Sequence, residues 1–302
     1  MHASDLLHLK LREYFNRDIS YAGKLAEWFK TESEFVKYFK KVLYFQKAVI
    51  EPLEERGMTK TDTIVDIACG DGQMSLALFL KGYRNVTMFD MDSARLRFGR
   101  QLIEHLLELP NEVTTVNRSA LEISGPYDVV ISFQTVEHLS DTGNYSIASR
   151  RCQKAFLTRI NQITTKLIYI NAPNYVFPID GHDTGKWFFH FLPMSVRSYL
   201  ISNQYVACSW AGIARPVSLR FLRGALTNFD LKSNYYAFAT MGDYISNYPP
   251  FDYMGNEYRY YDPNRLPLKK AIVNRVAKVL GQQAQNFLPV LSVIFERKAA
   301  AD

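Results

Sequence analysis

Cysteine is scarce in this chain, and its spacing fits neither a disulfide-rich protein nor a zinc-finger protein. The 302 residues contain three cysteines, Cys69, Cys152 and Cys208, which lie far apart in the sequence. Disulfide frameworks and zinc fingers need several cysteines at short, regular spacings, so both are excluded. We therefore expect a protein of the reducing cytoplasm.

Long apolar runs are absent as well. No stretch of 18 or more apolar residues occurs, so we expect no membrane-spanning helix. Residues 1–15 alternate charges with leucines and lack the apolar block of a signal peptide. The formal net charge of +6 mildly favours an anionic partner, such as nucleic acid, an acidic lipid surface or a phosphorylated molecule. A solvated basic surface explains this charge equally well.

Strand and helix patterns alternate from about residue 59 onward. Short runs rich in β-branched residues, such as TIVDIACG and YDVVISFQ, predict buried strands, and the longer segments between them predict helices. The alternation predicts an α/β fold with a doubly wound, Rossmann-like sheet, for which we expect seven strands. The expected parts are an N-terminal helical segment (1–58), a ligand-binding core (59–214), an irregular insertion (215–285) and the last strand of the core (286–302).

A glycine-containing turn joins the first strand of this core to the next helix. Gly70 and Gly72 allow the backbone to approach a ligand closely, but Ser75 stands where a dinucleotide-binding turn has its third glycine. Asp66, near the strand end, would repel a pyrophosphate and would attract an ammonium group. Asp90, 20 residues after Gly70, suits the two hydroxyls of a ribose. These residues predict an adenosine that carries an amino acid, and they disfavour a nicotinamide dinucleotide and hence an oxidoreductase.

Three segments in this order, VDIACGDGQ, VTMFDMD and YDVVISFQTVEHL, resemble the motifs of class I S-adenosylmethionine-dependent methyltransferases. The usual first motif is acidic-x-Gly-x-Gly-x-Gly, and here Ala68 takes the place of the first glycine. The resemblance covers residues 40 to about 175 and the last strand. It implies S-adenosylmethionine as methyl donor and the following cofactor-binding residues: Asp66, Ala68, Gly70, Gly72, Asp90, Met91, Ser119, Ala120, Phe133 and Gln134.

The resemblance also implies a role for most of these residues. The first motif would line the methionine and ribose side of the donor, Asp90 would bind the ribose hydroxyls, and Met91 would pack on the adenine. The family often places an acidic side chain near the adenine amino group, where this chain has Ser119 and Ala120. Phe133 and Gln134 would face the methionine end.

Glu137 and His138 follow the predicted fourth strand and are the expected catalytic residues. His138 would remove the proton of an acceptor hydroxyl. Metal-assisted members of the superfamily place Glu-x-x-Glu-His here, but Gln134 replaces the first glutamate, and an amide is a poorer ligand. A divalent metal is therefore the less favoured alternative, with His182 or His190 completing its site.

The acceptor is expected beside the aromatic segment that follows the fifth strand. His182, Trp187 and His190 are the expected substrate-binding residues, in a segment that resembles the substrate lid of small-molecule and glycan O-methyltransferases. The Asn/Asp-Pro-Pro-aromatic motif of base N-methylation is missing after the fourth strand. The insertion at 215–285 is rich in tyrosine and ends in a basic amphipathic stretch, 266–283, which we expect to dock on the sheet. A peripheral membrane contact or a homo-oligomer contact is the lesser alternative for that stretch.

The sequence as a whole predicts O-methylation of a small molecule or a saccharide. An RNA 2′-O-methyltransferase also fits the basic charge and the Glu-His pair. A non-catalytic protein with the same fold is the remaining alternative, which the intact Gly70 and Gly72 and the acidic pair Asp66 and Asp90 disfavour.

Overall fold

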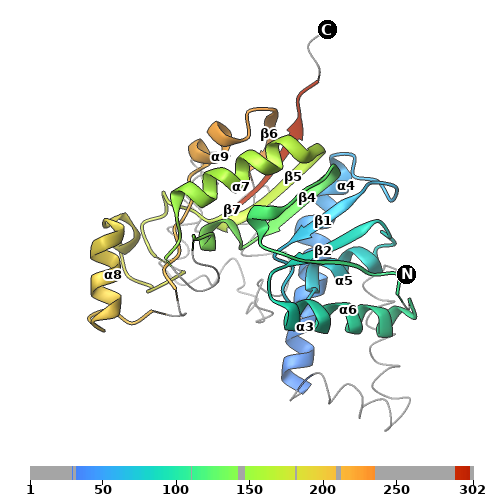
Figure 1. Ribbon diagram of the computed structural model, residues 1–302, viewed down its shortest axis with the longest axis horizontal. Coiled ribbons are helices and arrows are strands. Elements are labelled where there is room, and N and C mark those ends of the chain that lie inside the picture. The colour runs from blue at the N-terminus through green and yellow to red at the C-terminus, as the bar shows by residue number, and fades with distance from the viewer. Residues whose placement is uncertain are drawn as a thin grey trace, which may run out of the picture.

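The computed structural model describes residues 29, 32–109, 111–141, 147–180, 182–208, 212–234 and 290–299 (Figure 1). The tyrosine-rich stretch 235–289, its basic amphipathic part included, lies outside the described residues. In chain order, the described elements up to residue 122 are α3 (Glu32–Phe45), η1 (Gln46–Ile50), α4 (Glu51–Glu55), β1 (Ile64–Ile67), α5 (Gln73–Leu80), β2 (Val86–Asp90), α6 (Ser93–Leu107), β3 (Thr114–Asn117) and η2 (Ala120–Glu122). The others are β4 (Tyr127–Phe133), η3 (Val136–His138), α7 (Arg150–Ile163), β5 (Thr164–Pro173), η4 (Phe189–Phe191), α8 (Met194–Ser202), α9 (Leu219–Ala225), β6 (Phe229–Asn234) and β7 (Val290–Arg297).

The strands form one sheet, and its order within the described residues is β3-β2-β1-β4-β5-β7-β6. Strands β1 to β5 are parallel, whereas β7 lies antiparallel between β5 and β6. The prediction of a seven-stranded Rossmann-like sheet is confirmed. The order reverses between β1 and β4, and in such sheets ligands bind beyond the carboxyl ends of the strands at this point.

Helices cover both faces of the sheet, as Figure 1 shows. On one face, α3, η1, α4, α5 and α6 enclose a core that includes Phe45, Leu53 and Leu76, each at most 2% exposed. On the other face, α7 and α9 pack over a second core with Phe156 and Leu222. The helical nature of the N-terminal segment is confirmed from residue 32 onward. No described helix is both long enough and apolar enough to cross a membrane.

The segment after residue 215 differs from its prediction. We expected 215–285 to be irregular, but α9 and β6 lie within it, and β6 pairs with β7 as an edge of the sheet. The sequence of β6, FDLKSN, is short and largely polar, and its pairing shifts register between Leu231 and Ser233, so it lacks a clear alternating pattern. The described part of the predicted insertion ends with β6 at Asn234.

Candidate active site

The loop after β1 is tied to the end of β2 through one carboxylate. The amide nitrogen of Gly70 donates to Oδ2 of Asp90 at 2.8 Å, and the amide of Asp92 donates to Oδ1 of Asp90 at 2.8 Å. Ala68, Gly70 and Gly72 all have left-handed backbone angles, with φ of 55°, 53° and 76°. Glycine adopts this conformation freely, whereas Ala68 does so at a small cost. The sharp turn thus places several backbone groups at the carboxyl edge of the sheet.

The same loop packs closely on α6 through two glycines. A Cβ atom at Gly72 would come within 2.8 Å of Cε of Met88 and 3.1 Å of Cα of Gly99. A Cβ at Gly99 would come within 2.9 Å of the backbone of Asp71. The sequence interpretation overlooked Gly99, because a single glycine in a helical pattern gives no sign of what packs against it.

A cavity opens beyond the carboxyl ends of β1, β2 and β4. Seven of the predicted site residues line it: Ala68, Asp90, Met91, Ser119, Ala120, Gln134 and His138. The other lining residues are Phe89, Asp92, Arg95, Leu121, Thr135, Leu139 and Ser140. Met91 is 42% exposed, so its thioether is free to pack on a ligand ring. The cavity contains the residues that the motifs assign to the ribose and the adenine.

Asp66 lies behind this cavity rather than in its wall. It is 2% exposed, and its Oδ2 accepts a 2.6 Å hydrogen bond from the hydroxyl of Ser75. Burial raises the pKa of Asp66 to about 7, although the Ser75 bond acts in the opposite direction. Phe133 also faces away from the cavity and packs on Phe45 of the N-terminal segment, with 4.8 Å between ring centroids. The roles of Asp66 and Phe133 toward the donor stay predictions.

Helix α3 brings two further side chains to the glycine loop. Neither of these side chains was predicted from the sequence. The hydroxyl of Tyr38 donates to the backbone oxygen of Asp71 at 2.7 Å. Lys41 borders a second hollow together with Asp71 and Gln73. Burial lowers the pKa of Lys41, and the negative charges of Asp71 and Asp66 act against that shift. Lys41 could have been found from the sequence, because a lysine on the apolar face of a helix is uncommon without a partner.

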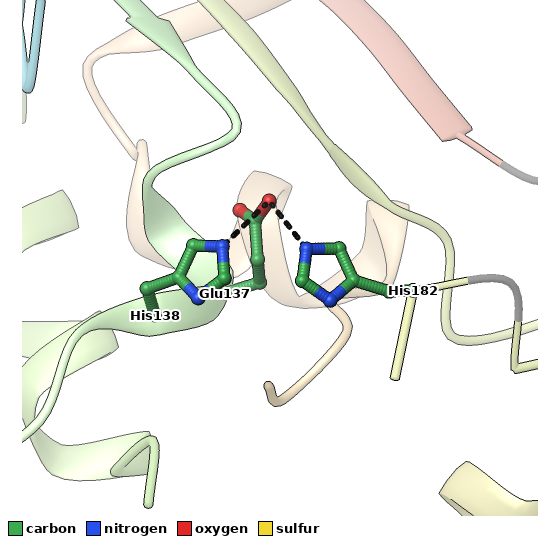
Figure 2. A group of neighbouring side chains, drawn as sticks. All are labelled: Glu137, His138 and His182. Atoms are coloured by element: carbon green, nitrogen blue, oxygen red, sulfur yellow. Dashed lines mark ion pairs between the residues drawn. The ribbon is translucent and has the colours of Figure 1, made fainter. Parts of the chain in front are cut away.

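Glu137, His138 and His182 form a cluster beside the cavity (Figure 2). Oε1 of Glu137 lies 3.8 Å from Nε2 of His138 and 4.0 Å from Nε2 of His182, with the two rings on either side of the carboxylate. Glu137 is fully buried, and neither of its carboxylate oxygens has a hydrogen-bond partner among the described residues. His138 belongs to both the cluster and the cavity wall, so the cluster adjoins the cavity.

Burial sets the protonation of these three side chains. It raises the pKa of Glu137 to about 7, with His182 acting in the opposite direction. It lowers the pKa of His138 to about 3, and the neighbouring His182 adds to that effect. Burial alone would lower the pKa of His182, but the hydrogen bond to Asp183 and the charge of Glu137 outweigh it, so the pKa is raised. A histidine as weakly basic as His138 is a neutral nitrogen ligand or acceptor near neutral pH.

The other two predicted substrate residues lie outside the cluster. Nε2 of His190 is 3.0 Å from the backbone oxygen of Tyr175, and the ring is 4% exposed. Trp187 is 65% exposed, and its neighbour Phe188 is 57% exposed. Of the two histidines proposed to complete a metal site, the structure brings His182 to Glu137 and keeps His190 on Tyr175.

Comparisons with known proteins agree with this geometry. A family described as "Methyltransferase domain" matches residues 64–154, which contain the glycine loop, Asp90 and Glu137. A ubiquinone biosynthesis O-methyltransferase from Pseudomonas paraeruginosa (strain DSM 24068 / PA7) is 27% identical over 177 residues, 57% of this chain and 69% of that protein. A ribosomal protein L11 methyltransferase from Bacillus pumilus (strain SAFR-032) is 32% identical over 79 residues, 26% of this chain and 25% of that protein.

Among solved structures, magnesium protoporphyrin IX methyltransferase from Synechocystis PCC 6803 with bound SAH has a TM-score of 0.50. It is 12% identical, and the match covers 96% of this chain and 99% of that one, which supports the shared fold. The sheet order and the glycine loop thus define a Rossmann-like methyltransferase. Residues 64–154 match a methyltransferase domain, and the sheet has the fold of class I S-adenosylmethionine-dependent methyltransferases.

Proposed function

We propose that this enzyme methylates a hydroxyl group of a small molecule, and that a divalent cation held by Glu137, His138 and His182 assists the transfer. The observation that carries the proposal is the state of Glu137. A fully buried carboxylate whose two oxygens accept no hydrogen bond from any described residue is costly, because a buried charge needs compensation. A cation between the three side chains would provide that compensation.

The chemistry of the donor set fits a transition-metal ion. The two imidazole nitrogens lie 3.8 and 4.0 Å from Oε1 of Glu137, too far for hydrogen bonds, so the three groups do not satisfy one another. Two imidazoles and one carboxylate suit Zn²⁺, Fe²⁺, Mn²⁺ or Co²⁺ better than Mg²⁺ or Ca²⁺, which prefer oxygen ligands. From the sequence, Gln134 made a metal the less favoured alternative. The geometry of the three side chains makes a metal the favoured one.

Methyl transfer from a sulfonium needs alignment of the acceptor and, for a weakly acidic hydroxyl, removal of its proton. When bound, the cation would lower the pKa of the acceptor hydroxyl. In the transfer, the bond between acceptor oxygen and methyl carbon forms as the bond between sulfur and methyl carbon breaks. The products are S-adenosylhomocysteine, a methyl ether and a proton. Asp90 and Met91 would hold the nucleoside, and His138 stands between the donor cavity and the acceptor side.

A ring-bearing acceptor is favoured by the segment after β5. Trp187, Phe188 and Phe191 are 65%, 57% and 39% exposed, and the rings of Phe188 and Phe191 are stacked with centroids 6.1 Å apart. Flat apolar surfaces of this kind suit aromatic or sugar rings. The relative that acts in ubiquinone biosynthesis is itself an O-methyltransferase, which supports oxygen as the acceptor atom. An RNA hydroxyl is the alternative that the net charge of +6 leaves in place.

A methyl-transfer assay with three acceptor classes tests the proposal. The enzyme is stripped with a chelator, reloaded with Mn²⁺, Co²⁺ or Zn²⁺, and offered S-adenosylmethionine with simple phenols, saccharides or an RNA oligomer. We expect a methyl ether of a phenol or saccharide, formed only by the reloaded enzyme. His190→Ala should regain activity when metal is added back, whereas Glu137→Gln should stay nearly inactive with or without added metal. Methylation of the RNA alone, or full activity of the stripped enzyme, would overturn the proposal.

A further inference from the structure

A buried ion pair stands directly behind the cluster. Nη2 of Arg197 donates to Oδ2 of Asp183 at 2.6 Å, and the two side chains are 2% and 0% exposed. Taking both charges out of water costs several kcal/mol per ion before any gain, so such pairs add little to stability on balance. The pair therefore points to a role other than holding the fold together.

Asp183 connects this ion pair to His182. Its Oδ1 lies 2.9 Å from Nδ1 of His182, while Oδ2 also accepts a 3.0 Å hydrogen bond from the amide of Ala214. A carboxylate only accepts hydrogen bonds, so Nδ1 of His182 carries the proton. In the neutral ring the other nitrogen, Nε2, then carries the lone pair, and it lies 4.0 Å from Oε1 of Glu137.

One short backbone segment joins this arrangement to the opposite side of the cluster. Ala214 accepts a 2.8 Å hydrogen bond from Arg197 through its backbone oxygen, and the amide of Arg215 donates to the backbone oxygen of Glu137 at 2.9 Å. Consecutive residues thus contact the ion pair and Glu137. The spacing between His182 and Glu137 is fixed through both of these contacts.

We propose that Asp183 and Arg197 are positioning residues, which hold His182 in its Nδ1-protonated tautomer with Nε2 directed at the cation site. This inference rests on the proposed function for the identity of the cation, but the tautomer itself needs no metal. Carboxylates that fix a ligating histidine in this way typically contribute about 10- to 100-fold to metal affinity. Arg197 compensates the buried charge of Asp183, so the carboxylate remains directed at the ring.

The test compares the wild type with Asp183→Asn by two measurements on the full chain. The first is nitrogen NMR of the His182 ring in metal-free protein at about pH 9, above the usual titration range of histidine. The second is a Co²⁺ titration followed by visible absorption. In Asp183→Asn we expect the Nδ1-protonated form to lose its dominance and Co²⁺ affinity to fall by about 10- to 100-fold. Arg197→Lys, which retains the charge, should stay closer to the wild type than Arg197→Met.

Matched controls separate positioning from general stability. Asp62→Asn breaks a 2.8 Å ion pair with Lys166 near the amino ends of β1 and β5. This variant should change neither the His182 spectrum nor Co²⁺ affinity. Binding of S-adenosylhomocysteine shows that each variant is folded. An unchanged tautomer and unchanged Co²⁺ affinity in Asp183→Asn would overturn the inference. A changed tautomer with no Co²⁺ binding by the wild type would support the positioning pair and overturn the metal part of the proposed function.

Discussion

The amide of Gly70 donates a 2.8 Å hydrogen bond to Oδ2 of Asp90, and this bond joins the loop after β1 to the tip of β2. The second oxygen of Asp90 accepts from the amide of Asp92, so both carboxylate oxygens hold backbone. Asp90 is 7% exposed and lines the cavity beyond the strand ends. One side chain therefore shapes the cavity and presents a negative charge to it.

Asp90→Asn should weaken donor binding strongly. The amide retains one acceptor oxygen and turns an NH₂ group toward a backbone N–H, so one of two charge-assisted bonds is lost. Calorimetry with S-adenosylhomocysteine should show affinity reduced by about 10- to 100-fold, because the loop shifts and a charge-assisted bond to a ribose hydroxyl, worth about 1.5–3 kcal/mol, is lost as well. Asp128 lies near the amino end of β4, away from the cavity, so Asp128→Asn should bind like the wild type. Equal affinities for both variants would contradict the assignment of Asp90.

Gly99→Ala should disturb the glycine loop from a distance. The added Cβ would come within 2.8 Å of Met88 and 2.9 Å of the Asp71 backbone, so the loop must shift. We expect lower thermal stability and weaker donor binding, both measured on the same preparation. Gly224→Ala is the matched control, because the added Cβ would meet no other described part of the chain within 4 Å and alanine favours the helix by about 0.5–1 kcal/mol. If Gly99→Ala behaved like Gly224→Ala, the close approach would have no consequence.

Asp66 should make the stability of the donor-free protein depend on pH. Burial raises its folded pKa to about 7, above the usual value of about 3.9, so the folded state binds the proton more tightly than the unfolded state. The free energy of unfolding then falls as pH rises from about 4 to 7, by at most about 1.4 kcal/mol per pH unit. Asp66→Asn removes this dependence. In urea unfolding, the stability advantage of Asp66→Asn should grow over that range and level off above it.

Two further results complete the Asp66 prediction. Asp128→Asn should show the opposite trend, because hydrogen bonds from Thr63 and Thr165 lower the pKa of Asp128. The contribution of Asp128 is therefore lost on acidification, and it is small because the side chain is only half-buried. Asp66→Asn should also bind S-adenosylmethionine more weakly, if Asp66 attracts the ammonium group of the donor. Parallel curves for Asp66→Asn and the wild type would exclude an unfavourable charge at Asp66.

Glu137→Gln should separate donor binding from methyl transfer. The amide has the shape of the carboxylate but no charge, and Glu137 lies behind His138 rather than in the cavity wall. Affinity for S-adenosylhomocysteine should stay within about two-fold of the wild type, while Co²⁺ affinity and turnover fall by at least about ten-fold. Unchanged turnover with a methylatable acceptor would show that the cluster takes no part in the reaction.

The sheet was predictable because its strands and helices differ clearly in period. β1, β2, β4 and β5 are buried, β-branched runs, and the last strand, β7, is an apolar run as well. The edge strand β6 was missed because its sequence is largely polar. An edge strand pairs on one side only, so polar residues can face solvent there. Several residues of the cavity wall were predictable from local spacing, because the loop and the strand tip are each continuous in sequence.

The expected acceptor side depends on contacts between distant segments, so only candidate residues could be named there from the sequence. Glu137 and His182 are 45 positions apart, and nothing local distinguishes His182 from His190. The contacts of Asp183 with Arg197 and Ala214 place His182 at the cluster, while Tyr175 holds His190 away. Such choices are made by tertiary packing and are absent from the pattern of a single chain.

The most direct test of the account is anomalous diffraction from crystals of the enzyme grown with S-adenosylhomocysteine and Mn²⁺. The account predicts an anomalous peak bound by Glu137, His138 and His182, with the nucleoside in the cavity beside Asp90 and its sulfur directed toward the metal. A well-ordered S-adenosylhomocysteine with no anomalous peak at the three side chains would contradict it.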